Sequence, residues 1–127
     1  MQQKLRMLDE ARKAVPEVDA AQAKAEFDDG RVAVLLDVRE AYEWRRGHIP
    51  GAVRIPVDEV PEAADASSSE PDPNLIQNRE GRIIVYCDKG VRSLLAAHEM
   101  KKLGYSDVAS MAGGIKGWSA SGYPVER

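Results

Sequence analysis

One contiguous unit limits the possible folds more than any other: an apolar strand, a tight loop and a helix in direct succession. Residues 82–86 form a short apolar run typical of a buried strand, and the chain's single cysteine, Cys87, follows at once. Helical spacing of apolar residues begins after the loop, and Gly104 stands where a C-terminal cap belongs. Such a unit is the building block of parallel sheets, so it predicts an α/β fold.

Other segments continue this alternation of strands and helices. Residues 32–36 are apolar throughout, as expected for a strand buried on both faces. Residues 107–111 predict another strand, residues 15–18 a short edge strand, and residues 53–57 a strand that Pro56 confines to an edge or a strand end. We therefore predict a mainly parallel central sheet of about five strands with helices on both faces.

The N-terminal residues 2–14 show the apolar spacing of a helix, which Pro16 ends. This helix could pack on its own domain or serve as a partner-binding extension. Terminal amphipathic helices usually cover their own core, which favours packing on the domain. We treat residues 1–127 as a single domain, with residues 1–15 as a helical extension.

A second helix is expected after Asp19, with Gln22 at capping-box spacing. Residues 61–73 contain acids, small residues and prolines, but no basic and no large apolar side chain. Such a segment buries little, so it predicts a mobile acidic surface loop and not a domain boundary. Asn74 is the candidate cap of a helical turn that follows.

Composition excludes several function classes. A net charge of -3, with Arg45-Arg46 as the nearest basic cluster, argues against nucleic acid as a partner. No apolar run approaches the roughly 20 residues that span a bilayer, and the N-terminus lacks the apolar core of a secretory signal. One cysteine forms no internal disulfide, which suits a reducing compartment, and no metal-ligand spacing is present. We expect a cytoplasmic monomer without cofactor or metal.

The loop after the cysteine has the composition of an anion cradle. Ligands of open α/β sheets bind beyond the carboxyl ends of the strands, and a helix N-terminus there carries partial positive charge. Lys89 and Arg92 would add cations if they turn inward, which would favour the thiolate of Cys87. Asp88 would oppose it unless it faces solvent, which we expect, or pairs with Lys89. A lone cysteine is often merely a small buried hydrophobe, so the residues alone leave both interpretations open.

Three motifs together resemble the rhodanese family of sulfurtransferases. They are residues 36–40 (LDVRE) with Trp44 and residues 47–52 (GHIPGA), residues 84–93 (IVYCDKGVRS), and residues 112–118 (AGGIKGW). Their order and spacing make the resemblance specific, and it covers residues 18–124. It implies a single-domain rhodanese fold. It also implies catalytic, substrate-binding and structural roles for residues within these motifs.

The resemblance implies that Cys87 attacks the outer sulfur of a donor such as thiosulfate and passes it, as a persulfide, to cyanide or a cellular thiol. The substrate-binding residues would be Asp88, Lys89, Gly90, Val91, Arg92 and Ser93. An alternative is a sulfur-carrier or binding module with little small-molecule turnover, served by a sulfur-relay protein. Related cysteine phosphatases and arsenate reductases carry five residues between Cys and Arg. The four residues here disfavour that third possibility.

The first motif is expected to support the fold. The resemblance makes Asp37 and Arg39 structural residues that pin neighbouring loops by charge-assisted hydrogen bonds. His48 is expected to make local hydrogen bonds in a turn, and Trp44 and Trp118 to pack.

Overall fold

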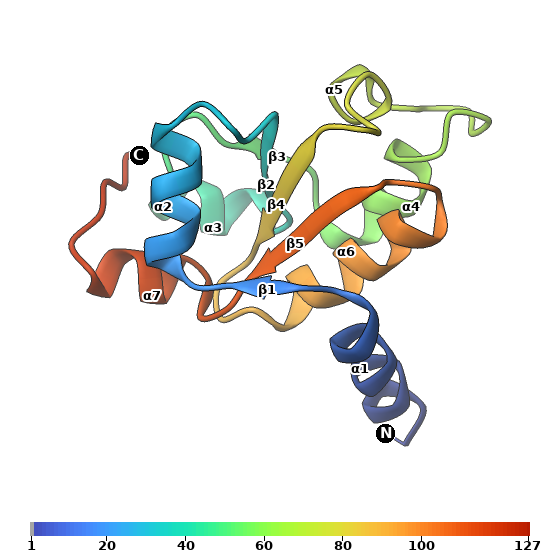
Figure 1. Ribbon diagram of the computed structural model, residues 1–127, viewed down its shortest axis with the longest axis horizontal. Coiled ribbons are helices and arrows are strands. Elements are labelled where there is room, and N and C mark those ends of the chain that lie inside the picture. Colours follow the sequence, from blue (N-terminus) through green and yellow to red (C-terminus); the bar gives the residue numbers. More distant parts are fainter. Residues whose placement is uncertain (1) are drawn as a thin grey trace.

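The computed structural model describes residues 2–127, which form a parallel five-stranded sheet with helices on both faces (Figure 1). The spatial order of the strands is β1-β5-β4-β2-β3. The strands are β1 (Glu17–Val18), β2 (Val34–Asp37), β3 (Val53–Arg54), β4 (Arg82–Tyr86) and β5 (Asp107–Met111). The predicted α/β class, the number of strands and their parallel direction are confirmed.

The helices divide between the two faces of this sheet. They are α1 (Gln2–Ala14), α2 (Ala20–Asp28), α3 (Ala41–Arg46), the 3₁₀ turn η1 (Val57–Glu59), α4 (Val60–Ala63), α5 (Pro73–Ile76), α6 (Val91–Lys102) and α7 (Gly114–Ala120). One core cluster lies between the sheet and α1, α4 and α6. The other lies between the sheet and α2 and α7.

Strand β4 contributes alternate side chains to these two clusters. Ile83, Val85 and Cys87 belong to the cluster on the α6 side, whereas Ile84 and Tyr86 belong to the cluster on the α7 side. The alternation follows from the two-residue period of a strand. It directs the cysteine side chain toward α6, whose first residues follow only a few positions later.

Helix α1 packs against α6, as the first of the two interpretations predicted. Ala11 and Val15 are buried in the cluster on the α6 side. The earlier turns project beyond the body of the molecule, and Leu5 and Met7 there are 58% and 47% exposed (Figure 1). None of the helices within residues 2–127 has the length and apolar character needed to cross a bilayer.

The predicted loop of residues 61–73 begins as a helix. Residues 61–63 belong to α4, and Ala63 and Ala64 are buried in the core. The prediction erred because small alanines suffice to pack where two helices approach closely, and α4 contacts α6 here. The cap of the next helix also differs: the Asp72 side chain accepts a hydrogen bond from the Asn74 N–H at 2.8 Å, so Asp72 and not Asn74 is the N-cap. Mobility of the remaining loop stays a prediction.

The predicted capping box at the start of α2 forms only one of its two hydrogen bonds. The Asp19 side chain accepts a hydrogen bond from the Gln22 N–H at 2.8 Å. The Gln22 side chain donates to Glu26 at 2.8 Å instead of returning to Asp19. Strand β3 is shorter than the predicted 53–57, because the chain turns into η1 directly after Pro56.

Candidate functional site

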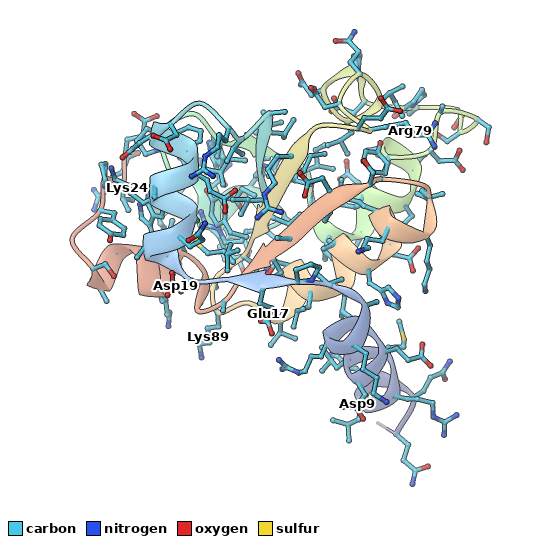
Figure 2. The ribbon with its side chains drawn as sticks, viewed as in Figure 1. Asp9, Glu17, Asp19, Lys24, Arg79 and Lys89 are labelled. Atoms are coloured by element: carbon cyan, nitrogen blue, oxygen red, sulfur yellow. The ribbon has the colours of Figure 1, made fainter. Side chains whose placement is uncertain are left out.

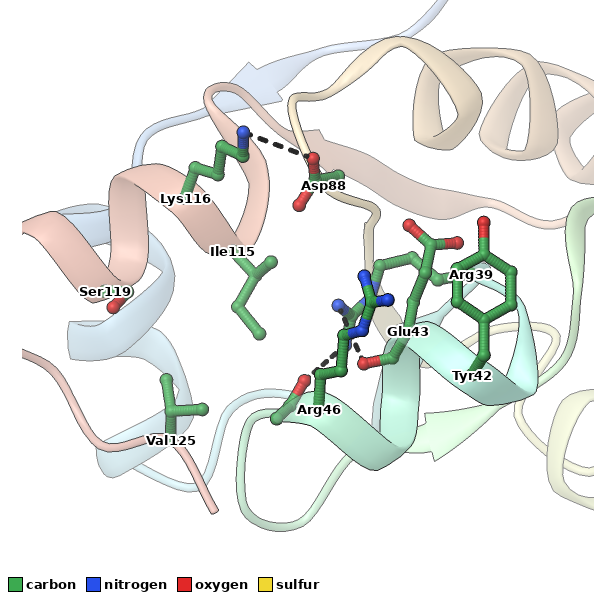
Figure 3. Close-up of a pocket in the computed structure, with 10 residues that line it drawn as sticks. Arg39, Tyr42, Glu43, Arg46, Asp88, Ile115, Lys116, Ser119 and Val125 are labelled. Atoms are coloured by element: carbon green, nitrogen blue, oxygen red, sulfur yellow. Dashed lines mark hydrogen bonds and ion pairs between the residues drawn. The ribbon is translucent and has the colours of Figure 1, made fainter. Parts of the chain in front are cut away.

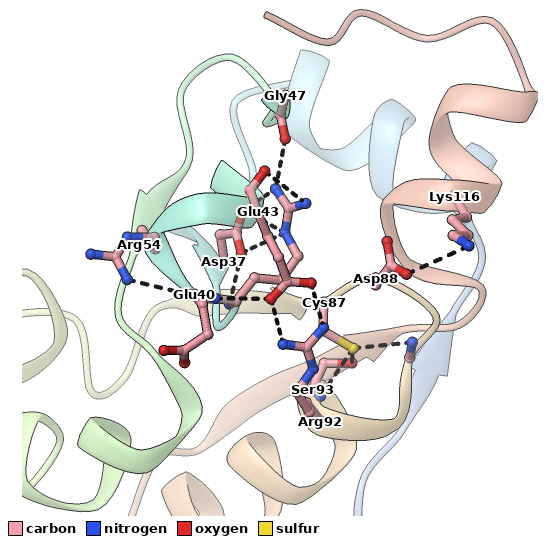
Figure 4. A network of polar contacts seen from close by, with 12 residues as sticks. Asp37, Glu40, Glu43, Gly47, Arg54, Cys87, Asp88, Arg92, Ser93 and Lys116 are labelled. Carbon is pink, nitrogen blue, oxygen red and sulfur yellow. Dashed lines mark hydrogen bonds and ion pairs between the residues drawn. The ribbon is translucent and has the colours of Figure 1, made fainter. Parts of the chain in front are cut away.

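Cys87 lies directly after β4, at the carboxyl edge of the sheet, and its thiol is held by backbone amides. The N–H groups of Gly90 and Ser93 donate to Sγ at 3.1 and 3.4 Å (Figure 4). Gly90 is the N-cap of α6 and has a φ of 108°, a left-handed conformation that glycine adopts without strain. The loop therefore curls around the sulfur and presents the first amides of α6 to it.

Two serines continue this polar cluster into the sheet. Ser93 Oγ lies 3.4 Å from Cys87 Sγ and 2.8 Å from Ser110 Oγ, and both serines are fully buried. Ser93 is one of the predicted site residues, whereas Ser110 was missed. Its signal was a polar residue inside the apolar strand β5, which pairs with β4.

Helix α7 supports the loop from the other side. The N–H groups of Ile115 and Lys116 donate to the carbonyls of Cys87 and Asp88 at 2.9 and 3.2 Å. A Cβ at Gly114 would lie 2.4 Å from the Asp88 carbonyl oxygen, and Gly114 has a φ of 57°. Gly114 of the third motif is thus required by close backbone approach, which the sequence did not reveal.

Arg92 is held by a carboxylate from outside the predicted site. Its two terminal nitrogens bond Glu43 Oε1 and Oε2 at 2.7 and 2.8 Å, in the two-pronged geometry that suits guanidinium and carboxylate (Figure 4). The hydrogen bond from Arg92 lowers the pKa of Glu43 to about 2. The same bond raises the pKa of Arg92. The guanidinium predicted as a cation for the sulfur thus carries its own counter-ion.

The other charged residues of the loop, Asp88 and Lys89, match expectation only in part. Asp88 Oδ2 lies 3.7 Å from Lys116 Nζ, so Asp88 pairs with α7 and not with Lys89 (Figure 4). Its side chain is 33% exposed and points away from the sulfur, in keeping with the predicted solvent-facing side. Lys89 is exposed and projects outward from the molecule (Figure 2), and Val91 is 40% exposed. Lys89 therefore does not meet the condition, an inward-turned side chain, under which it would add a cation close to the sulfur.

Asp37 and Arg39 form a buried ion pair at the end of β2. Arg39 Nη2 bonds Asp37 Oδ2 and the Gly47 carbonyl, each at 2.8 Å, which ties the strand end to the turn after α3. His48 Nδ1 lies 3.0 Å from the Trp44 carbonyl, and the two rings stack with centroids 3.6 Å apart. These contacts match the structural roles expected of the first motif. Trp118 is buried and packs, also as expected.

Two hollows adjoin the loop. The smaller, of about 180 Å³, is lined by Cys87, Asp88, Lys89, Val91 and Arg92. The larger, of about 440 Å³, lies between α3 and α7 (Figure 3). Its lining includes Tyr42, Arg46, Asp88, Ile115, Lys116 and Val125. Asp88 borders both hollows, so the cysteine loop lies between the recess beside Cys87 and the wider groove.

Comparisons with known proteins agree with this geometry. The sequence model described as the rhodanese-like domain matches residues 19–121. A sulfurtransferase from Allochromatium vinosum is 27% identical over 111 residues, which cover 87% of this chain and 94% of that protein. The putative sulfur carrier protein YrkF of Bacillus subtilis is 33% identical over 106 residues, or 84% of this chain. The chain spans about half of that protein's length. It spans about a quarter of the adenylyltransferase/sulfurtransferase MoeZ of Mycobacterium tuberculosis, with which it shares 38% identity over 77% of its own length.

Solved structures give the same result. A Rhodopseudomonas palustris protein of unknown function, described as a possible tyrosine phosphatase, superposes with a TM-score of 0.90 at 30% identity. The superposition covers 97% of this chain and 93% of the other. The human single-domain sulfurtransferase superposes with a TM-score of 0.71 at 29% identity, over 84% and 96% of the two chains. Because the family model spans most of the chain, and the cysteine loop, its glycine supports and the buried Asp37–Arg39 pair all occur in the fold, this protein belongs to the rhodanese-like domain family.

Proposed function

We propose that the protein is a sulfurtransferase that works through a persulfide on Cys87. The thiolate attacks the outer sulfur of a donor such as thiosulfate; the S–S bond of the donor breaks, and sulfite leaves with its electron pair. A thiophile, either cyanide or a thiol, then attacks the outer sulfur of the persulfide and releases the Cys87 thiolate. The cycle is a two-step, ping-pong transfer.

The observation that carries this proposal is the pair of amide hydrogen bonds to the sulfur. Gly90 and Ser93 direct their N–H groups at Cys87 Sγ from the start of α6. Donors fixed in this way stabilise negative charge as it develops, and they need no reorganisation during the reaction. The recess of about 180 Å³ beside Cys87 has room for an added sulfur atom. The four residues between Cys87 and Arg92 are the spacing expected for sulfur transfer.

A second candidate is a sulfur carrier that receives its persulfide from a partner protein. It is favoured by the charges of the loop, because Arg92 and Lys116 both have carboxylate partners. A site with paired cations attracts dianionic thiosulfate weakly. The relatives described as a sulfur carrier and as MoeZ support a place in such a relay.

Phosphatase activity, which the description of the Rhodopseudomonas palustris protein raises for that protein, is not proposed here. A phosphate must be held by several amides and by a free arginine, and Arg92 is bonded to Glu43. The loop is also one residue shorter than the loop of the cysteine phosphatases.

The test is incubation with thiosulfate and cyanide, with thiocyanate followed in solution and the mass of the protein followed in parallel. We expect one added sulfur atom and thiocyanate release in the wild type, and neither in Cys87→Ser. A persulfide that forms without thiocyanate turnover would favour the carrier. Equal thiocyanate from both proteins, with no added sulfur, would refute a Cys87 persulfide.

A further inference from the structure

The charged groups around the cysteine form a nearly neutral set. Arg92 is paired with Glu43, Lys116 with Asp88, and Arg39 with Asp37. Lys89 borders the recess, but it is exposed to solvent and its side chain projects outward. The recess therefore presents amide dipoles to a ligand, but its nearest arginine is already bound to a carboxylate.

Glu43 is held in place so that its carboxylate neutralises the charge of Arg92 and occupies its terminal N–H groups, which we call masking. Its side chain is 15% exposed, and both carboxylate oxygens bond the guanidinium. Oε1 also accepts a hydrogen bond from the Glu40 N–H at 3.0 Å, at the first turn of α3. The carboxylate is thus fixed by its own helix as well as by Arg92, and a donor would have to displace an ordered, two-pronged ion pair to reach the cation.

We propose that Glu43 determines the donor specificity of the cysteine recess: by masking Arg92, it makes the site take sulfur preferentially from donors of low negative charge. This inference rests on the sulfurtransferase function proposed above. The preferred class would be a hydropersulfide of a small thiol or of a protein. The Cys87 thiolate attacks the outer sulfur of the hydropersulfide, and the S–S bond of the donor breaks. The donor leaves as a thiolate, and the proton of the transferred outer sulfur stays on the new Cys87 persulfide.

The charge of the recess can be measured without any sulfur transfer, because Cys87 is the chain's only thiol. Iodoacetamide and iodoacetate alkylate thiols by the same chemistry, but only iodoacetate is an anion. The ratio of the two rate constants reports the electrostatic potential near Cys87. The intrinsic reactivity of the thiol cancels in this ratio, because it affects both reagents equally. The experiment compares wild type, Glu43→Gln, Arg92→Gln and the double variant, with folding checked by circular dichroism.

The masking predicts a definite pattern across these four proteins. Glu43→Gln leaves an unpaired cation and should raise the iodoacetate-to-iodoacetamide ratio about fivefold to tenfold at low salt. Arg92→Gln leaves an unpaired carboxylate and should lower the ratio. The double variant restores neutrality and should return close to the wild-type ratio.

Glu40→Gln is the matched control. It removes the same charge one turn earlier in the chain, its carboxylate points away from Arg92 (Figure 4), and its N–H bond to Glu43 is kept. It should leave the ratio close to that of the wild type. If Glu40→Gln and Glu43→Gln raise the ratio equally, or if neither does, masking of Arg92 is refuted.

The donors themselves complete the test. Thiosulfate carries two negative charges and benzenethiosulfonate one, and both would leave the same persulfide on Cys87, releasing sulfite and benzenesulfinate. Glu43→Gln should speed persulfide formation from thiosulfate about tenfold relative to benzenethiosulfonate. An unchanged relative rate would refute the specificity role. The predicted alkylation pattern without persulfide from either donor would instead keep the masking and refute the proposed sulfur transfer.

Discussion

Glu43 and Arg92 lie 49 positions apart in the sequence, and their contact decides the electrostatics of the cysteine loop. The sequence pointed to Arg92 but gave no partner for it. A signal was present: Glu43 stands at the start of a helix that follows β2, and β2 pairs with β4 so that Asp37 lies beside Tyr86. Both strands deliver their next residues to the same edge of the sheet, where an acid and a base can meet.

This pairing gives a pH dependence with a defined sign. The pKa of Glu43 falls from 4.5 to about 2 because of the hydrogen bond from Arg92, so the ionised carboxylate stabilises the folded state. That contribution is complete above pH 4.5 and disappears as the pH falls through about 2. Urea unfolding at a series of pH values should show the wild type more stable than Glu43→Gln at pH 6, with the difference shrinking between pH 4.5 and 2. A difference that stays constant over this range would contradict the pairing.

Arg39 provides a second prediction at this scale. Its side chain is 5% exposed, and its guanidinium bonds both Asp37 oxygens and the Gly47 carbonyl, a set that one ammonium group cannot satisfy. Arg39→Lys should lower the free energy of unfolding by about 3 kcal/mol, measured by urea denaturation. Arg45→Lys, at an exposed position of the neighbouring helix, is the control and should change it little. Similar losses in both variants would contradict a special role for the buried fork.

Among the elements, β4 and β5 were predicted to the residue because each is a short, mainly apolar segment that starts at a charged residue, Arg82 or Asp107. The contact between α7 and the cysteine loop could not be predicted, because it joins backbone groups and leaves no pattern in side-chain chemistry. Only the two glycines of residues 112–114 hinted that two segments approach closely there. The sequence thus predicted the site's thiol, its turn and a helical segment that begins at residue 115, but not the contact by which this helix supports the loop.

The support from α7 can be tested at Gly114. Gly114→Ala places a methyl group against the carbonyls of Cys87 and Asp88 at a φ of 57°, so it should cost about 2 kcal/mol or more of unfolding free energy. Gly117→Ala, in the same helix, has no atom within 4 Å of the added carbon. It should be neutral or stabilise the protein by up to about 1 kcal/mol. Thermal or urea unfolding of the two variants checks the contrast, and equal stability would refute the close approach.

Considered as a whole molecule, the domain includes the N-terminal helix as part of its core. Apolar spacing predicted α1 but left open what it packs on, because periodicity shows a face and not its partner. Likewise the strand order β1-β5-β4-β2-β3 was not predictable, since parallel strands of similar composition can be arranged in several ways. The burial of Ala11 and Val15 decides the first question.

A substitution at the contact between α1 and α6 tests this assignment. Ala11 is completely buried, so Ala11→Arg should destabilise the protein by about 2–4 kcal/mol, because a charged side chain must be forced out of the core. Met7→Arg introduces the same group at a position that is 47% exposed and should change stability by less than about 0.5 kcal/mol. Circular dichroism melts of both variants provide the measurement. If Ala11→Arg melted like the wild type, α1 would not be docked in solution.

The two backbone amides at the start of α7 also fix the length of the cysteine loop. They donate hydrogen bonds to the carbonyls of Cys87 and Asp88, while Gly90, farther along the loop, lies against the backbone of Gly113. An inserted residue would have to release one of these holds before the loop could widen to surround a tetrahedral anion. A change from sulfur to phosphate chemistry in this scaffold therefore requires changes both in the cysteine loop and at the start of α7. Lengthening the loop alone would break the backbone contacts that hold it in place.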